Sequence, residues 1–211
     1  MQCIRRFVRL NIFYKSPFLH VSHLNAVTVN VSIPMSTENQ NASCHQENLK
    51  EISWKKYMLL GETFDEGSKD LMIRDMVVVE DFLSEEEEKS LHSEVEPYMK
   101  RLRYEFDHWD EAIHGYRETE RLHWNTQNTL TLQRVRDMAF APGKPQSRLV
   151  HVLDLAAKGL IKPHIDNVRF CGNTIAGLSL LSDSVMRMAH EKHKERVVDI
   201  LLKRRSLYIM K

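Results

Sequence analysis

The sequence predicts an α+β domain, in which helices lie beside a sheet or extend from an all-β core. Apolar residues recur with helical spacing before residue 141, and five short β-type runs with turn-like gaps follow it. The segment 141–145, APGKP, separates the two regions. A chain of 211 residues is long enough for one such domain with a real core.

The first predicted helix begins after Ser84. Ser84 and Glu87 form a capping-box pattern, and the acidic run 85–87 suits the positive end of a helix dipole. We expect Pro97 to kink or restart this helix. The residues expected to face the core, at steps of four, three and four, are Leu91, Val95, Tyr98 and Leu102.

A second helix is predicted over 126–140, with Leu130, Leu132, Val135 and Ala139 facing the core. The charged stretch 104–121 is predicted to be a loop. A short β-rich run, 73–83, precedes the first helix. The later β-type runs are 148–155, 173–181, 185–189, 197–202 and 206–210.

Four regions are expected along the chain. No acidic residue occurs before Glu38, whereas arginines, hydroxyl residues and apolar residues do, which predicts a mitochondrial transit peptide over 1–37. The alternative is a disordered basic tail. Residues 38–72 are polar and predict a linker. We expect 73–146 to be the N-terminal helical part of a domain and 147–211 to be its partial β core.

Composition excludes several classes of protein. No apolar run approaches the roughly 20 residues that a membrane-spanning helix needs. A net charge of +1 supplies no general field for binding nucleic acid. The 3 cysteines are scattered, which argues against a disulfide framework and a zinc knuckle.

The candidate metal ligands are His164 and Asp166. Residues two apart on a strand point to the same face, so the pair could offer an imidazole and a carboxylate to one metal. With a second histidine they would form the facial triad of non-haem iron(II) enzymes. The spacing alone is weak evidence for a metal site, because the chain has 11 histidines and the same pattern occurs at His108-Trp109-Asp110. The alternative is a surface histidine beside an aspartate.

Three segments carry a likeness to a known family. The string HVLDLAAKGLIKPHIDNVRFCGNTIAGLSLLSDSVMRM, with VEDFLSEEEEKSLHSEVEP and YEFDHWDEAIHGYRETE, resembles the AlkB-like iron(II)/2-oxoglutarate dioxygenases. The likeness runs from about residue 75 to residue 211. It implies a double-stranded β-helix (jelly-roll) core, incomplete at its C-terminus, with an N-terminal helical extension.

The resemblance also implies a site. His164 and Asp166 would be two iron ligands, and Tyr208 would contact 2-oxoglutarate. In the family, 2-oxoglutarate chelates the iron(II) and is decarboxylated to succinate while a C–H bond is oxidised. The distal histidine and the arginine that pairs with 2-oxoglutarate are expected beyond Tyr208. The chain is therefore expected to be a truncated, inactive form with an exposed sheet edge, and His190 and His193 are expected to be solvated loop residues.

The residues and the resemblance together leave three alternative functions. The favoured one is a monomeric enzyme of the mitochondrial matrix that hydroxylates a protein or small metabolite, linked by resemblance to alkylation-induced necrosis and fatty-acid metabolism. The alternatives are oxidative demethylation of an RNA or DNA base, and a non-enzymatic truncated isoform. Residues that would line the substrate side, or equally serve packing and loops, are Tyr104, His108, Trp109 and His114.

Overall fold

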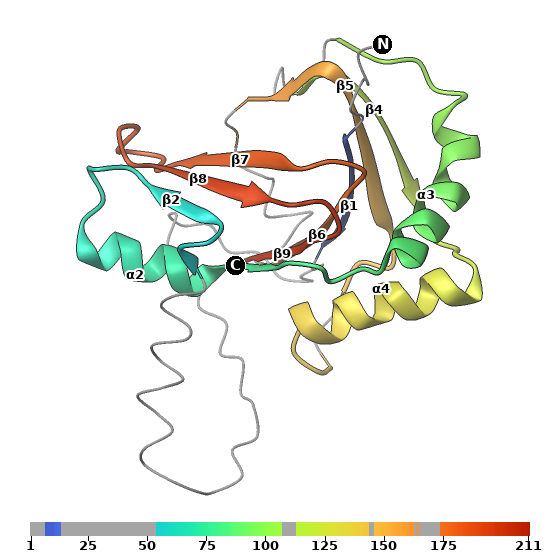
Figure 1. Cartoon of the computed structure of the whole chain (residues 1–211), viewed down its shortest axis with the longest axis horizontal. Coiled ribbons are helices and arrows are strands. Elements are labelled where there is room, and N and C mark those ends of the chain that lie inside the picture. Colours follow the sequence, from blue (N-terminus) through green and yellow to red (C-terminus); the bar gives the residue numbers. More distant parts are fainter. Residues whose placement is uncertain (1–6, 14–53, 107–112, 144–145, 163, 165–173) are drawn as a thin grey trace, which may run out of the picture.

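The computed structural model describes residues 7–13, 54–106, 113–143, 146–162, 164 and 174–211, with the backbone alone described for 7–13 (Figure 1). Its helices are α2 (Glu66–Asp75), α3 (Glu85–Met99) and α4 (Thr126–Ala139). Its strands are β1 (Phe7–Phe13), β2 (Met58–Leu60), β3 (Met76–Val79), β4 (Ile113–Arg121), β5 (Val150–Ile161), β6 (Ile175–Leu180), β7 (Ser184–Ala189), β8 (Val197–Leu202) and β9 (Leu207–Met210).

The strands form two antiparallel sheets. The larger has the order β3-β9-β6-β1-β5-β4, and the smaller has the order β2-β8-β7. This arrangement confirms the predicted α+β class. The five later β runs are also confirmed, because β5 to β9 begin within two residues of the predicted positions.

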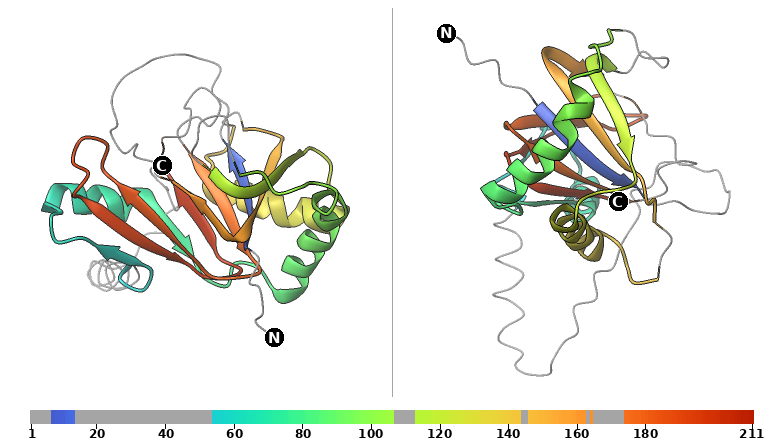
Figure 2. Two further views of the ribbon diagram at one scale, coloured as in Figure 1. Left: turned by 90° about the horizontal axis from the view of Figure 1, so that it is seen from above. Right: turned by 90° about the vertical axis from the view of Figure 1, so that its right-hand side faces the viewer.

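One hydrophobic core lies between α3, α4 and the outer face of the larger sheet (Figure 2). The helices contribute Leu91 and Val95 from α3 and Leu132 and Val135 from α4, each at most 1% exposed. The residues facing them come from β5, β6 and β9. The start of α3 is as predicted: Ser84 Oγ accepts from Glu87 N at 3.2 Å, and Ser84 N donates to Glu87 Oε2 at 2.9 Å.

A second hydrophobic core fills the space between the two sheets. The smaller sheet contributes Ile200 and Leu202, and the larger contributes Met76 and Tyr208. Because strand residues alternate between faces, β9 supplies Tyr208 to this core and its neighbours Leu207 and Ile209 to the first.

The prediction of which helical residues face the core was only partly right. Tyr98, Leu102 and Leu130 are exposed, at 50%, 39% and 68%. In α3 the next buried residue after Val95 is Met99, four positions further on. The helix ends at Met99. Pro97 does not interrupt α3, although its ring removes one backbone donor close to the C-terminal end.

Two regions differ from the sequence prediction. The segment 38–72, expected to be a linker, contains β2 and most of α2, and it places Trp54, Tyr57 and Met58 in the second core. These few large apolar side chains suffice to pack the segment against the second core, although its average composition is polar. The second difference is β4, which lies within the stretch 104–121 expected to be a loop. Its charged residues pair with side chains across the sheet, so polarity there does not mean exposure.

Candidate metal centre

The candidate metal ligands follow the C-terminal end of β5 in the chain. β4 and β5 pair over almost their whole length, with a register shift between His114 and Tyr116. At this irregularity Gly115 has a φ of +67°, and its backbone packs directly against Gly159 of β5. A β carbon on Gly159 would come within 3.0 Å of the Ala156 amide nitrogen. The two glycines therefore set the path of the segment that leads to His164.

His164 lies three residues beyond β5 and is exposed. Its Nδ1 is 2.8 Å from the carbonyl oxygen of Lys162. A carbonyl oxygen only accepts hydrogen bonds, so in the neutral imidazole Nδ1 carries the proton and Nε2 carries the lone pair. A backbone carbonyl that fixes the tautomer in this way is the usual arrangement for a histidine that binds metal through Nε2. The His164 side chain therefore fits the role of an iron(II) ligand.

The second predicted ligand, Asp166, lies outside the described residues. Within the part of the chain that the structure describes, no group of three His, Cys, Asp or Glu side chains is arranged to hold a metal ion. His190 and His193 lie in the connection between β7 and β8, with ring centroids 5.0 Å apart. His190 Nδ1 accepts from the backbone amides of Lys192 and His193. Both histidines thus occupy a loop, as expected.

Tyr208 is 2% exposed and lies in the second core, between the two sheets. The same core contains Tyr57 and Trp54, at 8% exposed each. Burial raises the pKa of the Tyr57 phenol above its usual value, partly offset by a backbone hydrogen bond. Tyr208 thus faces the interior between the sheets.

Of the four residues expected on the substrate side, the structure describes Tyr104 and His114, which have different contacts. Tyr104 donates to Asp154 Oδ2 at 3.1 Å, and its ring lies 4.7 Å from the Arg117 guanidinium. His114 is exposed on β4, with its ring 5.3 Å from that of Phe106. His108 and Trp109 lie outside the described residues. Tyr104 therefore belongs to a buried polar cluster.

Sequence reasoning missed that polar cluster. Asp154 is fully buried, and Arg117 contacts it from the neighbouring strand. A second cross-strand pair joins His151 and Glu118, with Nε2 and Oε2 2.8 Å apart. The sequence shows opposite charges in the two segments that form β4 and β5. These charges can be recognised as pairs only when β4 is known to lie beside β5.

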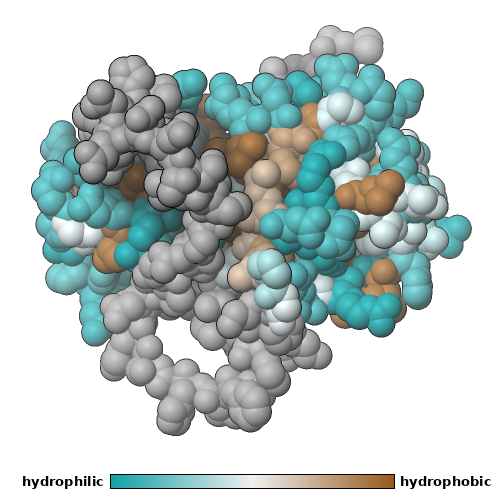
Figure 3. All heavy atoms as spheres, turned by 90° about the horizontal axis from the view of Figure 1, so that it is seen from below, coloured by the Kyte–Doolittle hydropathy of each residue, from teal (hydrophilic) through white to brown (hydrophobic). Residues whose placement is uncertain are grey.

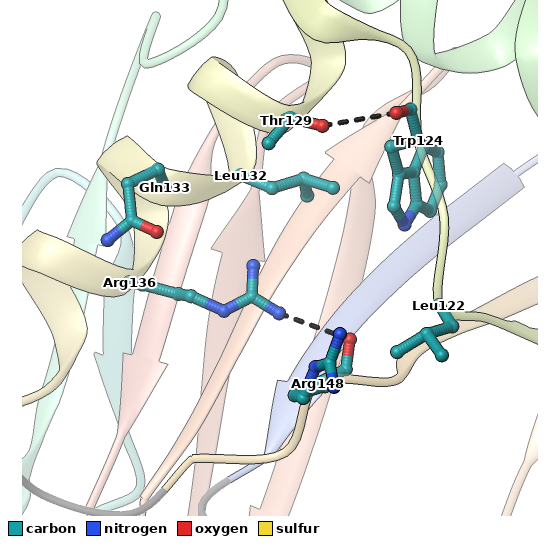
Figure 4. Close-up of a pocket in the computed structure, with 7 residues that line it drawn as sticks. All are labelled: Leu122, Trp124, Thr129, Leu132, Gln133, Arg136 and Arg148. Carbon is teal, nitrogen blue, oxygen red and sulfur yellow. Dashed lines mark hydrogen bonds between the residues drawn. The ribbon is translucent and has the colours of Figure 1, made fainter.

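A separate pocket of about 230 Å³ lies beside α4, near the start of β5 (Figure 4). Arg136 points into it and donates to the carbonyl oxygens of Ser147 and Arg148 at 3.3 and 3.5 Å. Burial lowers the pKa of the Arg136 guanidinium. The pocket and His164 flank opposite ends of β5, so the pocket does not form part of the candidate metal centre.

Known proteins support the resemblance seen in the sequence. No model of a protein family matches this chain. The chain is 54% identical over 140 residues to the mouse protein named "Alpha-ketoglutarate-dependent dioxygenase alkB homolog 7, mitochondrial". It is 52% identical over 135 residues to the protein of the same name from Bos taurus. The resemblance to the AlkB-like dioxygenases is confirmed.

The match covers 66% and 64% of this chain, and 63% and 61% of the two AlkB-like relatives. The chain thus spans less than two thirds of the length of either protein. The relatives' names describe a dioxygenase that uses 2-oxoglutarate and is mitochondrial.

Apolar atoms reach the surface in the middle of the face shown in Figure 3 and at separate points around it. Among the described residues, the most exposed large apolar side chains are Leu59, Leu130 and Val185. Among the residues that the structure describes, no helix is long and apolar enough to cross a membrane.

Proposed function

We propose that this chain carries the His-x-Asp half of an iron(II)/2-oxoglutarate dioxygenase site of the AlkB type. The identity of 54% over 140 residues to a protein of that name carries the proposal. The side chain of His164 supports it, because its bond to the Lys162 carbonyl leaves Nε2 as the metal-binding nitrogen. The two antiparallel sheets with a core between them are consistent with the jelly-roll core that the resemblance implies.

In this proposal His164 and Asp166 would hold iron(II), and Tyr208 would contact 2-oxoglutarate from β9. The bound metal and 2-oxoglutarate would supply oxidation of a C–H bond with release of succinate. The favoured substrate is a protein side chain or small metabolite in the mitochondrial matrix. The links to alkylation-induced necrosis and fatty-acid metabolism are part of the proposal and rest on the resemblance alone.

We expect weak iron binding and slow turnover for these 211 residues on their own. This expectation rests on the resemblance, which places a distal histidine and an arginine of the site beyond Tyr208. The mouse relative provides the reference for a full-length protein.

The test measures anaerobic iron(II) binding and succinate formation from 2-oxoglutarate. His164→Ala and Asp166→Asn should each weaken iron binding about tenfold or more, because even the loss of a hydrogen-bond partner of a metal ligand costs that much. His190→Ala is the matched control, since its imidazole lies in the β7–β8 loop, and it should leave binding unchanged. If His190→Ala weakens binding as much as His164→Ala, the proposed ligand pair is wrong. If succinate forms as fast as with the mouse protein, the expectation of slow turnover is wrong.

A further inference from the structure

The pocket beside α4 is built from one face of that helix and from the two connections that flank it (Figure 4). The α4 residues that line it occupy positions i, i+3, i+4 and i+7, which share one face of a helix: Thr129, Leu132, Gln133 and Arg136. The other walls come from the connection between β4 and α4 and from residue 148, just before β5. Three segments of the chain therefore meet at the pocket.

The polar side of the pocket is cationic. One terminal nitrogen of Arg136 donates to the carbonyl oxygens of Ser147 and Arg148, which fixes the guanidinium, and the other points into the pocket (Figure 4). Arg148 adds an exposed guanidinium at the edge. Within the described chain, burial alone accounts for the lowered pKa of Arg136. The neighbouring carboxylate, Asp137, accepts instead from Gln133 Nε2 at 2.8 Å. An anion in the pocket would offset the cost of burying Arg136.

Trp124 adds a hydrogen-bond donor to this side. Thr129 Oγ1 donates to the Trp124 carbonyl oxygen at 3.2 Å, and the Arg121 guanidinium lies 5.2 Å from the indole ring, so the ring is held in place. Figure 4 shows the indole nitrogen directed toward the pocket. Nε1 is buried and has no hydrogen-bond partner among the described residues. A buried donor without an acceptor is costly, and an occupant with an acceptor group would remove that cost.

The remaining walls are apolar. Leu122 is 40% exposed, Leu132 is 1% exposed, and the Trp124 ring lies beside them. Apolar walls with a few convergent polar groups are typical of sites for organic molecules. The volume of about 230 Å³ is below the range of roughly 300–1,000 Å³ that is usual for drug-sized ligands. The pocket therefore suits a molecule of only a few atoms beyond its charged group.

We propose that this pocket binds a small organic anion. Its carboxylate or phosphate group lies against Arg136 and Arg148, and its short apolar body lies against Leu122 and Trp124. A guanidinium holds either group through charge-assisted hydrogen bonds, so the two arginines recognise the chemistry that carboxylates and phosphates share. The small volume selects a free small molecule over a segment of a partner protein. The site lies at the opposite end of β5 from His164, and the proposal does not depend on iron or 2-oxoglutarate.

The experiment titrates the full chain with benzoate and with phenyl phosphate, and follows the indole N–H signal of Trp124 by NMR. The chain has 3 tryptophans, and Trp124→Phe identifies the signal. At least one of the two probes should shift it saturably, with a Kd of about 1 mM or tighter. The probe that binds more tightly tells whether the natural ligand is a carboxylate or a phosphate. Benzamide, the neutral analogue of benzoate, and inorganic phosphate, which lacks the apolar body, should each bind about tenfold more weakly or less.

Arginine variants test the location of the anion. Arg148→Met keeps the backbone carbonyl that accepts from Arg136, so it should leave the unfolding temperature unchanged and weaken binding of the better probe about tenfold. Arg136→Met should weaken binding at least as much. Arg134→Met is the matched control, because Arg134 also belongs to α4 but pairs with Glu87 at 2.7 Å. It should keep the affinity of the parent.

Four results would overturn the proposal. The first is no saturable shift with either probe at about ten times the expected Kd. The second is equal affinity for the organic anion and its neutral analogue, or for phenyl phosphate and inorganic phosphate. The third is equal loss of binding in Arg134→Met and Arg148→Met. The fourth is tighter binding of an acetylated tripeptide with one central glutamate, which would assign the pocket to a partner protein.

Discussion

Arg117 of β4 and Asp154 of β5 form a buried ion pair that joins the edge of the larger sheet to helix α3. Nε and one terminal nitrogen of Arg117 each lie 2.8 Å from Asp154 Oδ2. The Arg117 side chain is 9% exposed and the Asp154 side chain 0%. The remaining terminal nitrogen donates to the Met99 carbonyl at 2.7 Å. One guanidinium thus links two strands and the last turn of a helix.

We predict that Arg117→Met destabilises the protein by about 3–5 kcal/mol, because it leaves a buried carboxylate without its cation. The double variant with Asp154→Leu should recover part of that loss, since it removes both charges. The measurement is the free energy of unfolding in denaturant for the two single variants and the double variant.

The matched control is Arg187→Met, which removes an arginine paired with Asp199 across β7 and β8. The Arg187 side chain is 67% exposed, so its loss should cost about 1 kcal/mol or less. Equal losses for Arg117→Met and Arg187→Met would show that burial does not determine the strength of these pairs.

A second buried carboxylate, Glu88, holds the start of α3 against two turns. The Glu88 side chain is 2% exposed and accepts from Leu181 N at 2.8 Å and from Arg204 Nε at 2.8 Å. Leu181 has a φ of +70°, a conformation that a branched side chain adopts only under constraint. We predict that Glu88→Gln costs about 1.5–3 kcal/mol, the range for hydrogen bonds to a charged group.

The free energy of unfolding measures that cost. Glu85→Gln removes an exposed charge from the same helical turn and should change it by less than about 0.5 kcal/mol. If both variants lose the same stability, the loss comes from the helix dipole and not from the contacts with Leu181 and Arg204.

The stability of the α3 start should depend on pH through Glu87. Hydrogen bonds from Arg134 hold the pKa of the Glu87 carboxyl below its ordinary value of 4.5, against the opposing effect of burial. A carboxyl with a lowered pKa stabilises the fold above its unfolded pKa, and the stabilisation is lost as the pH falls through the folded pKa. The loss should therefore occur below about pH 4.5.

Unfolding free energies of the parent and Glu87→Gln, measured between pH 7 and pH 3, test this. The parent should be more stable at pH 7 by about 1 kcal/mol or less, because the pair is partly exposed. The difference should shrink below pH 4.5. A difference that is the same at pH 7 and pH 3 would contradict the prediction.

The sequence predicted elements that depend on local signals. The capping box at Ser84 and Glu87 began α3 where expected, and β5 to β9 followed their alternating or apolar runs. What it could not predict depends on distant partners. The part of β4 at 117–121 is mostly charged, and it is a strand because β5 pairs with it. β1 lies in a segment whose composition predicts a leader, and it pairs with residues 150–155 and 175–180, which are distant in sequence.

In the candidate site, too, local sequence patterns could be recognised and contacts with distant residues could not. The His-x-Asp spacing identified His164, and the structure adds its contact with the Lys162 carbonyl. Tyr104 was expected either on the substrate side or in a packing or loop contact. Its actual partners, Arg117 and Asp154, are 13 and 50 positions away in sequence and could not be inferred from local pattern.

The segment that carries His164 depends on Gly159. A β carbon at this position would meet the Gly115 backbone carbonyl oxygen and lie 3.0 Å from the Ala156 amide nitrogen. Both are backbone atoms, one in β4 and one in β5, so relieving the contacts requires a shift of β4 away from β5 and a change in the backbone of β5 itself. We predict that Gly159→Ala destabilises the protein by about 1–3 kcal/mol, the usual cost of overpacking.

The same substitution should weaken iron(II) binding, because it displaces the chain five residues before His164. Gly67→Ala is the matched control: Gly67 lies in α2, where a β carbon makes only an ordinary 3.5 Å contact with Asp65 Oδ1. Alanine there should raise stability by up to about 1 kcal/mol, since it favours the helix, and leave iron binding unchanged. Thermal unfolding and anaerobic iron(II) titration of both variants give the answer. If Gly159→Ala unfolds at the parent temperature and binds iron equally well, the close approach of Gly115 and Gly159 does not position the metal centre.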